Sequence, residues 1–135
     1  MPYACNCYYR LAAKEPALYF MSAMSSRHAQ QICSNPRVAG TIHAEPHDVS
    51  ELQGIQFLGN CVPVRPGPAG DPNWPANRKP SQAHETALED YVQSFAEALR
   101  VPGSFFRIEI SGLKFTNNRV SFGHKVLWNW PASEK

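Results

Sequence analysis

Residues 19–32 read YFMSAMSSRHAQQI, and this stretch decides how the fold is interpreted. Its first half is apolar and aromatic, which is typical of a strand, while Ser25-Ser26 offers hydroxyls that favour a helix start. We therefore expect a strand, a tight turn and a short helix over 27–33 that ends at Asn35-Pro36. The helix start suits an anion, because free backbone N–H groups, serine hydroxyls and the fork of Arg27 can all donate hydrogen bonds. Taken alone, the same pattern is also that of an ordinary helix cap, so both interpretations stay open here.

Length and composition indicate one folded domain, which we take as residues 1–135. Hydrophobic residues make up 43% of the chain and charged residues only 18%, which favours a packed core over disorder. No run approaches the roughly 18 apolar residues of a membrane helix, and the first residues lack a signal-peptide pattern. We therefore expect a cytoplasmic protein with reduced thiols and no membrane partner.

Short strands dominate the remaining pattern, and two helices accompany them. Apolar or alternating runs predict strands over 2–11, 18–24, 37–44, 49–64, 105–110, 113–116, 119–122 and 125–130. Apolar residues at three- and four-residue steps predict a second helix over 88–99. Between them, 65–84 is a proline-rich stretch without periodicity, which we read as one long loop. The fold class predicted is mainly β with two helices (α+β), arranged as an antiparallel barrel.

Several motifs carry a resemblance to a known family. Residues 26–32, followed by Asn35-Pro36-Arg37-Val38, resemble the flavin-phosphate segment of the pyridoxamine 5′-phosphate oxidase superfamily. Three segments are similar to its uncharacterised YhbP-like branch: 27–30, 54–59, and 114–118 continuing through 122–125 to Trp128. The similarity runs from about Tyr3 to Trp128, with the long loop unmatched. It implies a split antiparallel β-barrel that dimerises and binds FMN, a flavin nucleotide, between its subunits.

The resemblance also implies which residues hold the cofactor. The implied FMN-binding residues are Met21 and Ser22 along the flavin, Ser26, Arg27 and His28 at the phosphate, Cys5 and Asn6 on the strand facing the ring, Gln56 at the ring edge and Trp128 as an aromatic wall. Gln53 is an alternative to Gln56. His28 stands where the oxidases have lysine, and imidazole is mostly neutral near pH 7 and reaches less far than an ammonium group. The resemblance identifies no catalytic residue, and the arginine pattern that binds pyridoxamine phosphate in the oxidases is missing near Trp128.

The N-terminus departs from the pattern of the YhbP-like branch. Chains of that branch usually begin with a helix and a strand ahead of the segment that starts here at Pro2. We expect this chain to lack that helix and first strand, so that one edge of the barrel is uncovered. Either Met1 is an internal start, or the partner subunit or the 65–84 loop covers that edge.

Two main hypotheses for function remain. The first is an FMN-binding split-barrel homodimer that acts as a flavin-dependent oxidoreductase on an unknown substrate. The alternative is a non-catalytic dimeric binding module of the same fold with weak or no flavin binding. His28, in place of the lysine of the oxidases, is the reason for considering it. A nucleic-acid-binding barrel is not favoured, because the net charge is only +2 and the basic residues are dispersed.

The cysteines and Trp74 are two further candidates for a functional role. The four cysteines lack Cys-x-x-Cys spacing, so we expect thiols and not a zinc site. Trp74, within the long loop, is open between a lid, a dimer contact and an anchor for the loop.

Overall fold

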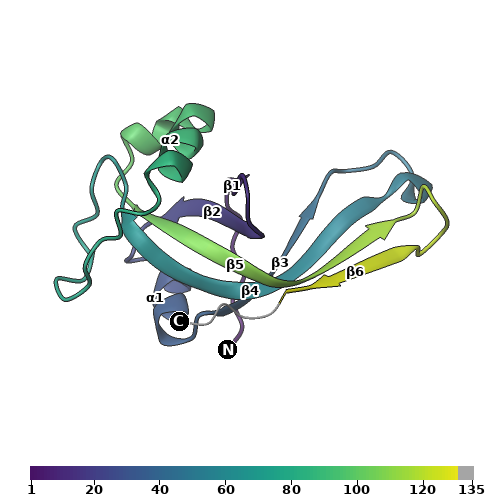
Figure 1. Ribbon diagram of the computed structural model, residues 1–135, viewed down its shortest axis with the longest axis horizontal. Helices are drawn as coiled ribbons and strands as arrows, with labels where there is room; N and C mark the ends of the chain where they lie inside the picture. The colour runs from purple at the N-terminus through teal and green to yellow at the C-terminus, as the bar shows by residue number, and fades with distance from the viewer. Residues whose placement is uncertain (131–135) are drawn as a thin grey trace. The chain divides into compact units, whose positions relative to one another are not determined.

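The computed structural model describes residues 1–130, and these form a mixed α+β fold dominated by strands (Figure 1). Six antiparallel strands build one open sheet in the order β1-β2-β5-β4-β3, with β6 also paired to β5. The strands are β1 (Tyr9–Leu11), β2 (Ala17–Ser22), β3 (Arg37–His43), β4 (Gln53–Pro66), β5 (Ser104–Asn117) and β6 (Lys125–Asn129). The helices are α1 (Arg27–Ser34) and α2 (Glu85–Ser94), with short 3₁₀ turns at Val49–Glu51 and Ala96–Leu99. The predicted fold class is confirmed.

The chain divides into two compact units, and the long strands β4 and β5 run through both. The first unit comprises Met1–Pro36 and Cys61–Glu109 and holds β1, β2 and both α-helices. The second comprises Arg37–Asn60 and the chain from Ile110 onward and holds β3 and β6. Within residues 1–130, no helix is long and apolar enough to span a lipid bilayer.

Strand β2 forms the middle of the first unit's core. Its residues Ala17, Leu18, Tyr19 and Phe20 are all buried, so both faces of the strand are covered. It pairs with β5, where Phe20 lies opposite Phe106 and the two rings stack with centroids 5.1 Å apart. Such aromatic cross-strand pairs stabilise a sheet beyond the area they bury. β2, which includes the first residues of the 19–32 segment, is therefore paired with β5 up to its end at Ser22.

Helix α1 starts and stops where the sequence predicts. Ser26 caps it in an extended conformation, and its hydroxyl accepts a hydrogen bond from the backbone N–H of Ala29. Asn35 is extended again at the other end, as expected for the residue before a proline. Ala29 is fully buried and fixes one face of this short helix against the unit.

The expected strand over residues 2–11 is wrong for most of its length. Only Tyr9–Leu11 pairs, with β2, and residues 1–8 have no regular structure. Instead of joining a sheet, this segment contacts α1: the Tyr3 ring lies on the Arg27 guanidinium, and Gln31 donates to the Met1 carbonyl. The aromatic composition that suggested a strand serves side-chain contacts here.

Further boundaries differ from the sequence prediction: the strand expected at 49–64 begins only at Gln53, after a 3₁₀ turn, and the strand expected at 18–24 ends at Ser22. The separate strands expected at 105–110 and 113–116 are one continuous strand, β5. Residues 119–122 form a turn and not a strand, because Asn118 accepts from the Gly123 backbone N–H and donates to the Val49 carbonyl. Gly123 has φ +75, which a side chain would strain. The second helix ends at Ser94 and continues as a 3₁₀ turn, so its predicted last turn is present in tighter form.

In the second unit, Gly40 of β3 lies opposite Phe57 of β4, and the buried Phe57 ring covers it. A methyl group added at Gly40 would overlap that ring. We therefore expect Gly40→Ala to lower the free energy of unfolding by about 1–3 kcal/mol, the usual cost of overpacking a core. Gly54→Ala is the control, because its methyl would meet the His43 Cβ at an ordinary 3.5 Å. Equal destabilisation of the two variants in urea unfolding would contradict the packing argument.

Candidate functional site

Three polar side chains converge where β2 ends and α1 begins. The Ser22 hydroxyl is hydrogen-bonded to Nε2 of His28. The Ser26 hydroxyl lies 3.4 Å from the Ser22 hydroxyl and 3.3 Å from the same nitrogen of His28. All three side chains are half-buried. The turn thus gathers two hydroxyls and an imidazole at the amino end of a helix, where backbone N–H groups also point outward.

His28 is uncharged in this cluster at neutral pH. Burial lowers the pKa of its imidazole below the ordinary value, because desolvation disfavours the charged ring. The cluster therefore consists of neutral groups that can each donate or accept a hydrogen bond. A negative ligand would change this balance, since an anion close to the ring favours its protonated form.

Arg27 supplies the positive charge next to the cluster. Its guanidinium carbon lies 4.5 Å from the centre of the Tyr3 ring, a cation–π contact, and both residues are exposed. Within residues 1–130, no carboxylate forms an ion pair with Arg27. The charge is therefore available to a ligand, while one face of the guanidinium rests on an aromatic ring.

Asp71 ties the proline-rich loop to the candidate site. One carboxylate oxygen accepts hydrogen bonds from the Met24 backbone N–H at 2.9 Å and from the Ser104 hydroxyl at 2.7 Å. The other accepts from the Asn73 backbone N–H at 3.0 Å. Desolvation pushes the pKa of Asp71 upward, but the bonds from Ser104, Met24 and Asn73 outweigh it and hold the pKa below its usual value. Since Ser104 lies opposite Ser22 across the β2–β5 pair, the carboxylate braces both sides of the turn.

The loop is ordered by further contacts of its own. Gly67 donates its backbone N–H to the Gly103 carbonyl at 2.8 Å, and Gly103 donates to the Gly70 carbonyl at 2.9 Å. The Trp74 indole donates to the Arg78 carbonyl at 2.9 Å, which holds the loop's tip together. Of the three roles left open for Trp74, this contact fits the anchor.

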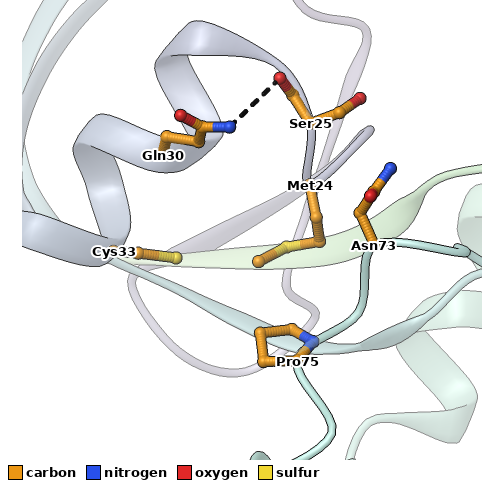
Figure 2. A pocket seen from close by; sticks show the side chains of 6 residues that line it. All are labelled: Met24, Ser25, Gln30, Cys33, Asn73 and Pro75. Carbon is orange, nitrogen blue, oxygen red and sulfur yellow. Dashed lines mark hydrogen bonds between the residues drawn. The ribbon is translucent and has the colours of Figure 1, made fainter.

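A pocket of about 380 Å³ lies between α1 and the loop (Figure 2). The residues that line it are Met24, Ser25, Gln30, Cys33, Asn73 and Pro75. Figure 2 shows the two loop residues, Asn73 and Pro75, on one side and Cys33 on the other, with Met24 between. None of these side chains is charged, so the pocket offers amides, a hydroxyl and sulfur atoms.

The residues predicted to bind the phosphate lie together. Those predicted to bind the flavin ring lie in different parts of the chain: on β2, in the segment before β1, and in the second unit. Ser22, Ser26 and His28 touch one another, and Arg27 follows in the chain. Met21, just before them in β2, donates its backbone N–H to the Tyr91 hydroxyl at 3.3 Å.

The predicted position of Cys5 and Asn6 on a strand is wrong. They were expected on a strand, but they lie in the irregular segment before β1, with Cys5 exposed and in contact with Cys7. The backbone edge that a strand would offer to a flavin ring is therefore not formed by these residues in the single chain.

Gln56 and Trp128 belong to the second unit. Gln56 is exposed on β4 opposite Thr41, and Trp128 is 45% exposed on β6 opposite Leu113. The alternative residue, Gln53, donates its amide to the Asn117 side chain at 3.3 Å. Gln56 is thus the one of the two glutamines with no such contact within residues 1–130, and its role stays a prediction.

Asp71 is the residue that the sequence reasoning missed. The stretch Gly70-Asp71-Pro72-Asn73 has the composition of a turn in which an aspartate accepts from the backbone two residues on, and that bond is present. Its bonds to Met24 and Ser104 could not be found that way, because both partners are distant in sequence.

Comparison with known proteins places these features in a family context. No protein-family model matches the chain. A UPF0306 protein from Photorhabdus laumondii is 28% identical over 123 residues, which cover 91% of this chain and 76% of that protein. The UPF0306 protein YhbP of Salmonella paratyphi A is 29% identical over 123 residues, covering 91% and 74%.

Solved structures show the same fold. A pyridoxamine 5′-phosphate oxidase-related, FMN-binding protein from Nostoc punctiforme superposes with a TM-score of 0.60 at 12% identity, covering 91% of this chain and 71% of that one. A heme-binding protein from Mycobacterium smegmatis gives a TM-score of 0.63 at 12% identity, covering 91% and 45%. The resemblance predicted from the sequence is confirmed: the chain is a homologue of the UPF0306 YhbP proteins and has the split-barrel fold of pyridoxamine 5′-phosphate oxidase-like proteins.

Proposed function

We propose that this protein binds FMN and holds its phosphate with Ser22, Ser26, Arg27 and His28. The observation that carries the proposal is the convergence of two hydroxyls and an imidazole beside an arginine that lacks a carboxylate partner within residues 1–130. The FMN-binding neighbour of the same fold supports the choice of ligand. We place the protein in the cytoplasm, where its four free thiols would stay reduced.

The chemistry of the cluster suits a phosphate monoester. A phosphate presents strong acceptor oxygens, and the Ser22 hydroxyl, the Arg27 fork and N–H groups at the start of α1 can donate to them. The Ser26 hydroxyl donates to the Ala23 carbonyl at 2.7 Å in the free protein and would turn away from it to bind a phosphate. Arg27 is the only one of these groups that carries a full charge in the free protein, because His28 is neutral. Met21, Cys5, Asn6, Gln56 and Trp128 are our candidates for contacts to the rest of the flavin. A bound flavin would supply the redox chemistry of an oxidoreductase, and the chain's part is to bind and orient it.

A titration with two flavins tests the proposal. FMN is added to the purified protein while flavin fluorescence and the visible spectrum are followed, and riboflavin, which lacks the phosphate, serves as the control. We expect saturable binding of FMN and much weaker binding of riboflavin. Absence of any saturable change at tens of micromolar FMN, or binding of hemin in its place, would overturn the choice of cofactor.

The alternative is a binding module of the same fold that takes flavin weakly or not at all. The observation in its favour is that His28 is neutral and that its Nε2 is already hydrogen-bonded to the Ser22 and Ser26 hydroxyls. On this alternative, FMN and riboflavin would both fail to saturate the protein, while the fold and its stability stay intact.

The state of His28 makes FMN affinity depend on pH. In the free protein the pKa of His28 is lowered, so the ring is neutral at pH 7. A bound phosphate would raise that pKa, so binding takes up a proton and the Kd should fall several-fold as the pH is lowered from about 8 to 6.5. His28→Lys should remove this slope and bind more tightly at pH 8, whereas His28→Gln should show neither change. A Kd of the unsubstituted protein that is the same at both pH values would contradict the assignment of His28.

We also propose that the protein is a homodimer, as the family resemblance implies. All five residues of β6 are exposed in the single chain, among them Leu127 at 69% and Trp128 at 45%. Exposed apolar strand residues of this kind mark a surface that another molecule covers. Light scattering at micromolar concentration should give the mass of two chains. Leu127→Lys should lower it to one, while Leu99→Lys, at an exposed leucine of the first unit, should not. A monomeric mass for the unsubstituted protein would contradict the proposal.

A further inference from the structure

All four cysteines lie in the first unit. Cys5, Cys7 and Cys33 are exposed, and Cys61 is fully buried. Burial raises the pKa of the Cys61 thiol to about 12, and its three fellow cysteines each add an electrostatic contribution, so they lie within electrostatic reach of it. Within residues 1–130, no three histidine, cysteine or acidic side chains are arranged to hold a metal ion. We therefore consider disulfide chemistry of these thiols.

Cys5 and Cys7 are the pair in direct contact. Their sulfur atoms lie 3.7 Å apart, and both side chains are exposed. We propose that these two residues form a dithiol that closes reversibly to a disulfide when it meets a low-molecular-weight disulfide such as glutathione disulfide. The two proposals share Cys5, which is also a candidate flavin contact, but disulfide closure needs only the two thiols and is tested on protein without FMN.

The local backbone allows the bond to form. A disulfide requires sulfur atoms about 2.0 Å apart and α-carbons roughly 4.4–6.8 Å apart. Residues two apart in a fully extended strand have α-carbons about 7 Å apart, just beyond this range. Residues 1–8 are outside any strand, so no ladder of hydrogen bonds holds Cys5 and Cys7 at that full extension. A modest bend of an exposed segment is enough to bring the two sulfur atoms together.

The exchange proceeds in two balanced steps. The Cys5 thiolate attacks one sulfur of the glutathione disulfide, whose S–S bond breaks, and one glutathione leaves as a thiol after taking up a proton. Cys7, as its thiolate, then attacks the sulfur of Cys5, and the second glutathione leaves in the same way. Overall two protein thiols are oxidised to one disulfide, and one glutathione disulfide is reduced to two thiols.

The surroundings of Cys7 suggest the order of attack. Although the Cys7 side chain is exposed, neighbouring protein atoms partly desolvate its thiol. This desolvation, followed by the charge and hydrogen bond of Cys5, raises the pKa of Cys7 to about 12, so Cys7 is a poor first nucleophile. Once Cys5 is held in a mixed disulfide, it no longer carries a charge, and its contribution to that shift disappears. Desolvation, the larger cause of the raised pKa, remains, so we expect the second step to be slower than the first.

Trypsin separates the cysteines conveniently for the test. Cleavage after lysine and arginine leaves Cys5 and Cys7 together in residues 1–10, Cys33 in residues 28–37, and Cys61 in a third, longer peptide. The folded protein is incubated with glutathione disulfide, free thiols are blocked, and the digest is weighed by mass spectrometry. We expect the 1–10 peptide to lose two hydrogen atoms and to escape blocking, and a reductant such as dithiothreitol to reverse both changes.

Matched variants decide between pair closure and general reactivity. Cys7→Ser should stop at a stable glutathione adduct on Cys5, and Cys5→Ser should give little adduct on Cys7. Cys33→Ser, at another exposed cysteine, should close the 1–10 disulfide at an unchanged rate. Glutathione adducts on Cys5 and Cys33 alike without an internal disulfide would overturn the proposal, and so would disulfide-linked chains as the main product.

Discussion

Arg27→Ala should weaken FMN binding roughly tenfold to a hundredfold, the largest loss of affinity that we expect from a single substitution. Hydrogen bonds to a charged group contribute about 1.5–3 kcal/mol each. Arg27 adjoins the Ser22, Ser26 and His28 cluster in the chain and carries a full positive charge, whereas His28 is neutral in the free protein. Its removal also releases the Tyr3 ring that rests on the guanidinium, 4.5 Å away.

The control for this substitution is Arg100→Ala. Arg100 is an exposed arginine of the same unit that pairs only with the neighbouring Glu97 among the described residues, so its loss should leave FMN affinity unchanged. Riboflavin adds a second check, because its weak binding should not depend on Arg27. Equal losses of FMN affinity in both arginine variants would mean that general surface charge attracts the flavin.

Asp71→Ala should lower the free energy of unfolding by about 2–4 kcal/mol, the largest stability effect that we expect outside the aromatic core. The substitution removes the acceptor of three hydrogen bonds and leaves the fully buried Ser104 hydroxyl and the Met24 N–H without this partner. A buried polar group that loses its partner costs roughly 1–3 kcal/mol. Asp71 connects the loop to the start of β5 and to the β2–α1 turn, and the substitution would remove the hydrogen bonds that make this connection.

Urea unfolding of Asp71→Ala should be compared with that of Asp48→Ala. Asp48 also accepts a backbone hydrogen bond, from Ser50 at 3.0 Å, but on an exposed turn, and we expect a far smaller shift of the midpoint. Because the pKa of Asp71 is lowered in the folded protein, its contribution is present near neutral pH and is lost as the pH falls below about 4. The difference between unsubstituted protein and Asp71→Ala should therefore shrink in acid. A constant difference between pH 7 and pH 3 would contradict the role of the carboxylate charge.

Local signals predicted the parts of the fold that depend on neighbours in sequence. The start of α1 at Ser26 and its end before Pro36 follow from a cap and a proline, both of which act within a few residues. The same is true of the strand character of β2, whose buried aromatic run is visible in the sequence. The resemblance to the YhbP-like branch added the arrangement of these elements as a split barrel.

The errors arose where long-range contacts decide the structure. Residues 2–8 have the composition of a strand, but Tyr3 lies on Arg27 of α1 and the Tyr8 ring lies 5.2 Å from the Phe95 ring. Residues 119–122 look like a returning strand, but the side chain of Asn118 binds both Gly123 and Val49 and holds a wider turn. Neither partner could be named from a local window of sequence.

In the candidate site, too, residues close in sequence were predictable and those with distant partners were not. Ser22, Ser26 and His28 were predictable together because a strand end and a helix start lie only a few residues apart. Asp71 was missed because its partners, Met24 and Ser104, come from other parts of the chain. A pattern of residues can thus suggest which groups bind a phosphate, but it does not reveal which residue holds the turn in place.

The β2–β5 ladder has a consequence for the order of events during synthesis. Its rungs join Ala17 with Glu109 and Ser22 with Ser104, so each spans most of the chain. Contacts this distant in sequence close slowly, because the loop entropy must be overcome before any rung forms. The apolar β2 therefore emerges from the ribosome long before its partner and stays uncovered until β5 follows. Nascent chains that stall before residue 104 should consequently be protease-sensitive and bind chaperones, whereas chains released after β5 should be protected.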